Sequence, residues 1–269
     1  MAELECKLRE DLCEVGRRLY NAGFMPGSSG NLSAILSENE ILITPSGVSK
    51  GFLQPEDIAK IDRQGNQLEG GILPSSEKAV HLAAYEERPD IRAVAHSHPP
   101  MLIAFSVAGL NFPGGILPEI EIMFGGNVPI APYATPGSRA LADSIRPHIR
   151  NRGISAVIMD HHGLIAVGHD IYQAAIRSEN AEAAAKVIFY ARQLGSAKTL
   201  SSENMKELRQ AYEEMIEKES STYLGCRRTP QTYWESESSR LSTAIFDSPN
   251  EADLEKIIRE AVKKAIDKD

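Results

Sequence analysis

A short stretch that ends in two histidines restricts the fold of this 269-residue chain more than any other. Residues 93–98 read A-V-A-H-S-H, and Pro99 and Pro100 follow directly. The small apolar residues predict a buried strand that stops at the prolines. Because successive side chains of a strand point to opposite faces, His96 and His98 lie on the same face, close enough to bind one metal ion.

A carboxylate precedes the helix that leads into this strand. Residues 74–77 read P-S-S-E, and an apolar helical pattern follows them. Taken alone, Ser75 is expected to cap the helix, and Glu77 is expected to be a favourable acid in its first turn. A carboxylate at this point of the chain is also suited to act beside the histidines, as a metal ligand or as a base.

A third histidine comes from a distant part of the chain. A buried strand is predicted for residues 154–160, and His161, His162 and Gly163 separate it from a second strand at 164–167. The glycine lets the chain turn sharply and brings an imidazole near a neighbouring strand end. Alternation places the two histidines on opposite faces, so the pattern leaves both open as the third ligand. Three histidines and one open position are typical of catalytic zinc sites, although Mn2+ and Co2+ also accept nitrogen ligands.

Three loops rich in glycine, serine and asparagine predict an anion site. They are residues 25–31, 44–47 and 74–77. Such loops expose backbone N–H groups and hydroxyls that bind a phosphate, and the same compositions also occur in ordinary turns. A metal beside a carboxylate suits removal of a proton next to a carbonyl, or cleavage of a carbon–carbon bond through an enediolate. The substrate expected for this combination carries a phosphate.

Composition argues against several other functions. The chain has 42% hydrophobic and 25% charged residues, as soluble globular proteins do, and no run approaches the roughly 18 apolar residues of a membrane helix. Its three cysteines have no C-x-x-C spacing and its first residues do not read as a secretory signal, so a cytoplasmic location is expected. A net charge of -8 argues against nucleic acid as the partner.

Helical and strand patterns fill most of the first 195 residues. Helices are expected at 4–22, 101–110, 138–149 and 170–194, the third broken at Pro147 and the last capped by Asp170. Strands are expected at 32–36 and 40–44, followed by a hairpin over 58–69. Residues 111–137 are rich in glycine and proline and are expected to form an irregular functional or interface loop.

Residues 196–269 differ in character from the rest. A helix is expected around 203–218, and a final helix opening at Asn250 carries an apolar stripe that must dock on its own core or on another subunit. An irregular polar stretch between them holds two tyrosines and two arginines, which are residue types often found in active sites. Packing or surface exposure is the expected role of these residues, which are Tyr223, Arg227, Arg228 and Tyr233.

Six motifs, taken together and in order, resemble the class II aldolase/adducin family. The resemblance covers about residues 4–195. The motifs are G-N-L-S at 30–33, T-P-S-G at 44–47, P-S-S-E at 74–77, H-S-H at 96–98, P-Y-A-T-P-G at 132–137 and H-H-G-L-I-A at 161–166.

The resemblance implies a fold and an assembly. The expected fold is a three-layer α/β/α domain around a mostly antiparallel central sheet. Residues 1–195 would form this catalytic domain, and residues 196–269 would form a helical extension that packs on the domain or on a neighbouring subunit. The family likeness also implies a homotetramer with active sites at subunit junctions.

The resemblance also assigns roles to residues. The zinc ligands of the family fall on His96, His98 and His162, because its third ligand directly precedes the glycine. The family's acid/base carboxylate falls on Glu77, which can also reach the metal before substrate arrives. The implied phosphate site is made of Gly30, Asn31, Ser46, Gly47, Ser75 and Ser76.

The activity implied is that of a metal-dependent aldolase in carbohydrate metabolism. It would reversibly cleave a ketose 1-phosphate such as L-fuculose 1-phosphate to dihydroxyacetone phosphate and an aldehyde, through a zinc-stabilised enediolate. Glu119 stands where the aldolase branch has a tyrosine, and the epimerase branch uses an acid there. The alternatives are therefore an L-ribulose-5-phosphate 4-epimerase, another sugar-phosphate lyase and a non-catalytic adducin-like module. Such a module should lack metal ligands.

Overall fold

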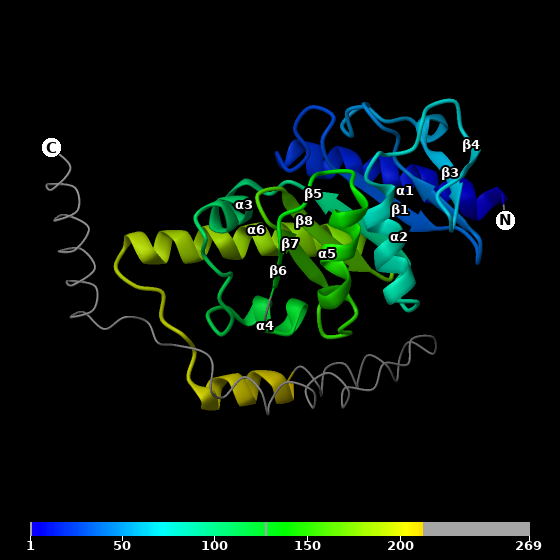
Figure 1. The fold of residues 1–269 in the computed structure, drawn as a ribbon. Coiled ribbons are helices and arrows are strands. Elements are labelled where there is room, and N and C mark those ends of the chain that lie inside the picture. Colours follow the sequence, from blue (N-terminus) through cyan, green and yellow to red (C-terminus); the bar gives the residue numbers. More distant parts are fainter. Residues whose placement is uncertain (1, 127, 212–269) are drawn as a thin grey trace, which may run out of the picture. The chain divides into compact units, whose positions relative to one another are not determined.

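The domain consists of one sheet between two layers of helices (Figure 1). A computed structural model describes residues 2–126 and 128–211, all of which lie in one compact unit. The three-layer α/β/α class expected from the sequence is confirmed, because the sheet is almost wholly antiparallel and helices cover both of its faces.

The sheet has eight strands in the order β4-β3-β2-β1-β5-β8-β7-β6. Every neighbouring pair is antiparallel except β6 and β7, which are parallel. The histidine strand β5 lies near the centre between β1 and β8, and all five of its residues are buried. The strands are β1 Asn31–Ile35, β2 Glu40–Ile43, β3 Ala59–Asp62, β4 Gln67–Glu69, β5 Ala93–Ser97, β6 Ile130–Ala131, β7 Ala156–Met159 and β8 Gly163–Gly168.

Alternation along the strands divides the core into two faces. Val94 of β5 packs in the cluster under α2 and α5, whereas Ala93 and Ala95 pack in the cluster under α1 and α6. A third cluster joins α3 and α4 to α6 and the β7–β8 end of the sheet. The helices are α1 Ala2–Asn21, α2 Lys78–Glu87, α3 Pro100–Val107, α4 Pro118–Phe124, α5 Arg139–Ile149 and α6 Ile171–Gln193, with a short 3-10 helix η1 at Pro55–Asp57.

Most of the predicted elements are confirmed within a few residues, including the hairpin β3–β4. The predicted cap of α6 is also confirmed, since the Asp170 side chain accepts a 2.7 Å hydrogen bond from the Gln173 N–H. The predicted cap of α2 is wrong. This helix begins only at Lys78, and Ser75 Oγ instead accepts the N–H of Glu77 at 3.2 Å in the turn before it.

Two further expectations are corrected by the structure. Helix α5 is not broken at Pro147 but continues to Ile149, because a proline in the last turn removes only one intrahelical hydrogen bond while Ile145 and Ile149 stay buried. The stretch 111–137 is not wholly irregular, since it contains α4 and β6. Pro118 in the first turn and Gly125 after the last residue are ordinary signals for a short helix.

The start of the C-terminal segment contacts the domain. The Leu200 N–H donates to the Gly115 carbonyl at 2.7 Å, and Arg209 lies 3.4 Å from the buried carboxylate of Glu121. The helix predicted from Asn250 and the residues Tyr223, Arg227, Arg228 and Tyr233 lie outside the described residues. The division into a 1–195 domain and a 196–269 extension therefore stays a prediction.

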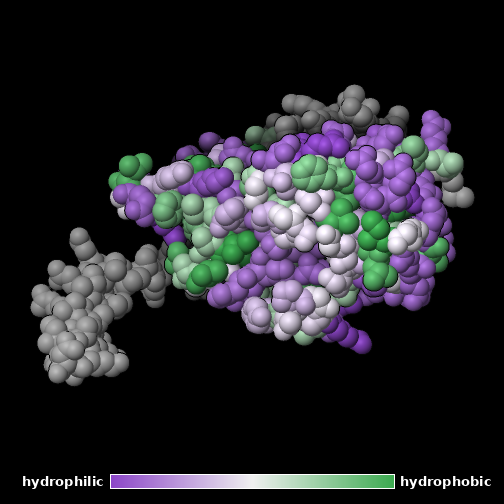
Figure 2. Space-filling view, turned by 90° about the horizontal axis from the view of Figure 1, so that it is seen from above, coloured by the Kyte–Doolittle hydropathy of each residue, from purple (hydrophilic) through white to green (hydrophobic). Residues whose placement is uncertain are grey.

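The surface seen in Figure 2 is mixed, with separate hydrophobic patches among hydrophilic residues. Among the described residues, no helix has both the length and the apolar character needed to span a bilayer.

Candidate metal centre

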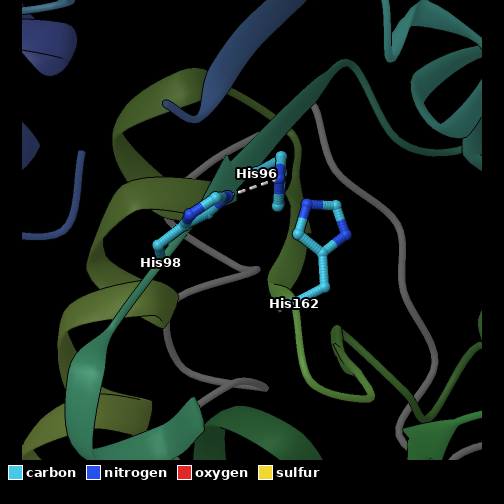
Figure 3. A group of neighbouring side chains, drawn as sticks. All are labelled: His96, His98 and His162. Carbon is cyan, nitrogen blue, oxygen red and sulfur yellow. Dashed lines mark hydrogen bonds between the residues drawn. The ribbon is translucent and has the colours of Figure 1, made fainter. Parts of the chain in front are cut away.

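Three imidazoles converge at one end of the central strands (Figure 3). His96 and His98 come from the end of β5, and His162 comes from the turn that leads into β8. Their candidate ligand nitrogens all lie within 4.8 Å of one another. The structure thus brings His162 to a pair of histidines that lies more than sixty residues earlier in the chain.

A hydrogen bond to the backbone orients the His96 ring toward the other two rings. His96 Nδ1 lies 3.0 Å from the Leu164 carbonyl oxygen, which can only accept, so this nitrogen carries a proton and Nε2 faces the other two rings. The Nε2 atoms of His96 and His98 are 3.0 Å apart. A second partner that fixes the tautomer of a histidine is typical of metal ligands.

Glu77 lies directly beside the histidines. Its Oε2 is 3.2 Å from His96 Nε2, and its Oε1 is 3.3 Å from His162 Nε2. Burial would raise the pKa of Glu77, but the hydrogen bond and charge of His96, together with Asn31 and His162, hold this pKa well below its ordinary value. The group is therefore a carboxylate at neutral pH, available as a ligand or as a base.

Burial keeps the neighbouring rings neutral. It lowers the pKa of His98 to about 3, with the charges of His96 and His162 acting in the same direction. The pKa of His162 is lowered by burial and by His96 as well. Neutral imidazole is the form that binds a metal, and three histidine nitrogens beside a carboxylate suit Zn2+ or a similar divalent ion.

The turn at residues 160–163 separates the two adjacent histidines. His161 has a positive φ of 56°, and its exposed ring bonds Asp160 at 2.8 Å and not the cluster. A Cβ added at Gly163 would lie 2.6 Å from the Ser97 carbonyl oxygen, so only glycine allows β8 to approach β5 this closely. The turn thereby directs His162, rather than His161, toward the pair from β5.

The three predicted phosphate loops lie next to one another. The Ser46 N–H donates to the Leu73 carbonyl at 2.9 Å, and the Ser75 N–H donates to the Thr44 carbonyl at 3.1 Å, so the second and third loops are joined. Ser46, Gly47 and Ser76 are exposed, whereas Ser75 is buried. Exposed backbone and hydroxyl groups of this kind are open to an anion.

The first loop reaches the metal centre. Asn31 pairs with His96 in the register of β1 and β5. Gly30 has a φ of 70°, and a Cβ there would lie 2.9 Å from the His96 carbonyl oxygen, so glycine is required at this position. The Asn31 Nδ2 group donates to Glu77 Oε2 at 2.9 Å, which connects the loop to the carboxylate.

Lys50 is a residue of this site that the sequence reasoning missed. Its side chain is buried, and Nζ donates to the carbonyl oxygens of Ser28 at 2.9 Å and Val48 at 2.7 Å, which ties the first loop to the second. Burial lowers the pKa of Lys50 to about 8, against the opposing charge of Glu77. Its place three residues after Gly47 was the only signal in the sequence.

Glu119 is not part of this cluster in the structure. It lies exposed in the first turn of α4, and it makes no hydrogen bond or ion pair within the described part of the chain. Glu121, one half-turn later, is buried instead and accepts the Gly115 N–H at 2.8 Å, which is a structural contact. The catalytic role predicted for Glu119 stays a prediction.

Residues 10–189 match the model of the family described as Class II Aldolase and Adducin N-terminal domain. This chain belongs to the class II aldolase and adducin family. The resemblance inferred from the six motifs is confirmed by this match.

Relatives within the family are named for reactions of different phosphorylated compounds. The chain is 34% identical over 186 residues to a 3-oxo-tetronate 4-phosphate decarboxylase of Haemophilus influenzae, covering 67% of this chain and 86% of that protein. It is 33% identical over 211 residues to a 5-deoxy-D-ribulose 1-phosphate aldolase of Bacillus thuringiensis, covering 77% and 96%. A solved structure of an L-fuculose 1-phosphate aldolase superposes with a TM-score of 0.70 at 29% identity, covering 77% of this chain and 96% of that one.

Proposed function

We propose that this protein is a metal-dependent aldolase that reversibly cleaves a ketose 1-phosphate, similar to L-fuculose 1-phosphate, to dihydroxyacetone phosphate and an aldehyde. The observation that carries the proposal is the group of three imidazoles beside the carboxylate of Glu77, next to loops open to a phosphate. The aldolase relatives support the substrate class.

The metal would be held by His96, His98 and His162, with Glu77 as a further ligand before substrate arrives. Zn2+ is the ion proposed, and Mn2+ or Co2+ would fit the same nitrogen ligands. When bound, the ion supplies a positive charge beside the substrate oxygens, which stabilises the negative charge of an enediolate.

Glu77 is the proposed acid and base. In the direction of condensation its carboxylate takes a proton from the carbon next to the carbonyl of dihydroxyacetone phosphate. In the direction of cleavage the substrate hydroxyl next to the breaking bond loses its proton as it becomes the aldehyde, and Glu77 returns one proton to the carbon of the enediolate. Asn31 occupies Oε2, whereas Oε1 accepts no hydrogen bond among the described residues, so Oε1 is the oxygen available for the proton.

The phosphate would bind at the three loops. Backbone and side-chain groups of Gly30, Asn31, Ser46, Gly47, Ser75 and Ser76 are the proposed contacts. The Asn31 Nδ2 group carries two protons, of which one goes to Glu77, so the other remains for a phosphate oxygen. Lys50 adds a buried positive charge beside the first two loops, which favours an anion there.

Decarboxylation is the second candidate function, because the 3-oxo-tetronate 4-phosphate decarboxylase relative is as similar as the aldolase relative. Loss of carbon dioxide from such a 3-oxo acid leaves the enediolate of dihydroxyacetone phosphate. That enediolate then needs only one proton at carbon, which Glu77 can take up from solvent and deliver. The two reactions therefore share every residue of the proposed site and differ in the group that leaves.

Epimerisation and a purely structural role have less support. A 4-epimerase of L-ribulose 5-phosphate rests on Glu119 alone, which is exposed and apart from the cluster. A non-catalytic adducin-like module is disfavoured by the complete set of histidines with Glu77. The homotetramer and the cytoplasmic location are also proposals, and the family likeness supports the former.

Release of dihydroxyacetone phosphate tests the proposal. The zinc-loaded full chain is incubated with a panel of ketose 1-phosphates and, separately, with 3-oxo-tetronate 4-phosphate, and the product is followed by coupled reduction with NADH. Release with an aldehyde supports the aldolase, and release with carbon dioxide supports the decarboxylase. Formation of xylulose 5-phosphate from L-ribulose 5-phosphate would favour the epimerase, and no product from any substrate would contradict all three.

A further inference from the structure

A chain of hydrogen bonds leads from Glu77 into the core of the protein. Asn31 Nδ2 donates to Glu77 Oε2 at 2.9 Å, and Asn31 Oδ1 lies 2.5 Å from His81 Nε2. His81 Nδ1 lies 2.7 Å from Ser33 Oγ, which in turn lies 2.7 Å from the Tyr85 hydroxyl. The four residues behind Glu77 are all buried, with side chains at most 3% exposed.

Two simple spacings produce this chain. Asn31 and Ser33 are two residues apart on β1, so they share one face of the sheet. Glu77 directly precedes α2, and His81 and Tyr85 follow it at intervals of four residues. All three side chains therefore lie along one side of the helix. The polar side chains of the strand and of the helix alternate along the contact between them. No part of the proposed reaction described above uses His81, Ser33 or Tyr85.

The direction of every bond in the chain follows from its charged end. An ionised carboxylate only accepts, so Asn31 must turn its NH2 group to Glu77 and its carbonyl to His81. His81 must then carry its proton on Nε2, which leaves Nδ1 as an acceptor for the Ser33 hydroxyl. Because Ser33 has only one proton to give, the Tyr85 hydroxyl must donate to Ser33. All four donors therefore point toward Glu77.

A charged ring would reverse part of this order, since both nitrogens of a protonated histidine donate. Burial lowers the pKa of His81 to about 3, with the charge of His96 adding to the effect, so the ring is neutral across the physiological range. A neutral ring whose Nε2 faces Asn31 Oδ1, which can only accept, keeps its proton on Nε2 and accepts the Ser33 hydroxyl at Nδ1.

We propose that His81 is a positioning residue for the reaction proposed above. Held in place by Ser33 and Tyr85, it fixes the amide of Asn31 with its NH2 group facing Glu77. The NH2 group in turn holds the carboxylate beside the histidine cluster. Without His81 the Asn31 amide is free to rotate. Its carbonyl oxygen would have no donor, and its NH2 group would hold Glu77 Oε2 from a side chain that is anchored at one end only. The carboxylate would move away from the place where Oε1 meets the substrate carbon.

This role predicts a loss in kcat and not in KM. Asn31 is one of six proposed phosphate contacts, so most of the phosphate site stays intact, whereas the carboxylate that moves the proton loses the hydrogen bond that positions it. Replacing a residue that orients an active-site group typically costs 10-fold to 100-fold. The inference rests on the proposed function, so its test needs one measurement that depends on activity and one that does not.

The kinetic measurement compares His81→Leu with His81→Gln in the zinc-loaded full chain. Leucine removes the N–H that Asn31 accepts, and glutamine can restore it. For His81→Leu we expect a kcat lower by about 10-fold to 100-fold, a KM within about threefold of the wild type and an unchanged zinc content. His81→Gln should recover at least about half of the loss in kcat on a logarithmic scale.

The matched control is Val80→Ala. Val80 is the neighbouring buried residue of α2, and its truncation destabilises the core without touching the hydrogen-bond chain. We expect a lower melting temperature for this variant with an unchanged kcat. The inference is overturned if His81→Leu keeps the wild-type kcat, or if its loss is matched by Val80→Ala or by His81→Gln.

The second measurement reads the tautomer of His81 directly and needs no substrate. The full chain is labelled with 15N-histidine, and His81→Gln identifies the ring signals. We expect a protonated Nε2 and a bare Nδ1 from pH 6 to 8, with a shifted Nδ1 signal in Ser33→Ala. A proton on Nδ1 would overturn the inference whatever the activity. A protein that is inactive on every substrate but has the expected tautomer would contradict the proposed function. It would leave the proposed order of the hydrogen bonds intact.

Discussion

The histidine cluster and the phosphate loops meet at Asn31, yet they are built in different ways. The cluster consists of side chains fixed by the central strands, and His96 is 1% exposed. The loops offer exposed groups at Ser46, Gly47 and Ser76, and their positions relative to one another depend on a few hydrogen bonds. A buried set of side chains holds a geometry, whereas exposed loops can adapt to a ligand.

This difference predicts that changes in the cluster abolish activity, whereas changes in the loops weaken substrate binding. The largest effect is expected from the metal. Treatment with a chelator should remove all activity, and added Zn2+ should restore it, because the three imidazoles offer the only grouped nitrogen ligands among the described residues.

His162→Ala tests whether His162 is the third ligand of the metal. It should lower the zinc content measured by atomic emission to well below one ion per chain and lower kcat/KM at least about 100-fold. The matched control is His161→Ala, which removes an exposed ring from the same turn. A zinc content that falls in His161→Ala and not in His162→Ala would reverse the assignment.

Glu77→Gln should have the next largest effect. It keeps the size of the side chain but removes the base, so kcat should fall about 100-fold to 10,000-fold while the protein still binds zinc. Glu86→Gln on the exposed side of α2 is the control, because its carboxylate pairs only with Arg146 among the described residues. Activity in Glu77→Gln within threefold of the wild type would exclude Glu77 as the acid and base.

Lys50→Met tests the loops. It removes the charge and both bonds that join the first loop to the second, so KM for the phosphorylated substrate should rise about 10-fold while zinc content and the tautomer of His81 stay the same. Lys198→Met, at an exposed position, should change neither constant. A fall in kcat without a change in KM would show that Lys50 acts on the cluster instead.

The smallest effect is one of pH on stability. The folded pKa of His81 is about 3, below the value near 6.5 in the unfolded chain, so the unfolded state binds the additional proton as the pH falls. The free energy of unfolding of the wild type should therefore decrease by about 2 kcal/mol more than that of His81→Gln between pH 7 and pH 5. Chemical denaturation at both pH values measures this difference, and parallel losses in the two proteins would contradict it.

Local patterns in the sequence determined most of the fold. Periods of two and 3.6 residues are set by neighbours in the chain, so the strand with His96 and His98 and the helices α1 and α6 could be predicted closely. The helix α4 was missed although it carries a proline and a glycine at its ends, because the surrounding glycines and prolines obscured its short apolar face. The order of the six motifs was enough to identify the family.

The tertiary structure alone decided how distant residues meet. The choice between His161 and His162 depended on a left-handed turn that alternation does not describe. In the sequence, His81 and Lys50 resemble ordinary residues of a helix and of a loop. Only the register of β1 with β5 and the contacts of His81 with β1 and of Lys50 with the first loop place them behind the site. Periodicity is a property of one segment, whereas a site is made by contacts between segments, and these are fixed only when the sheet forms.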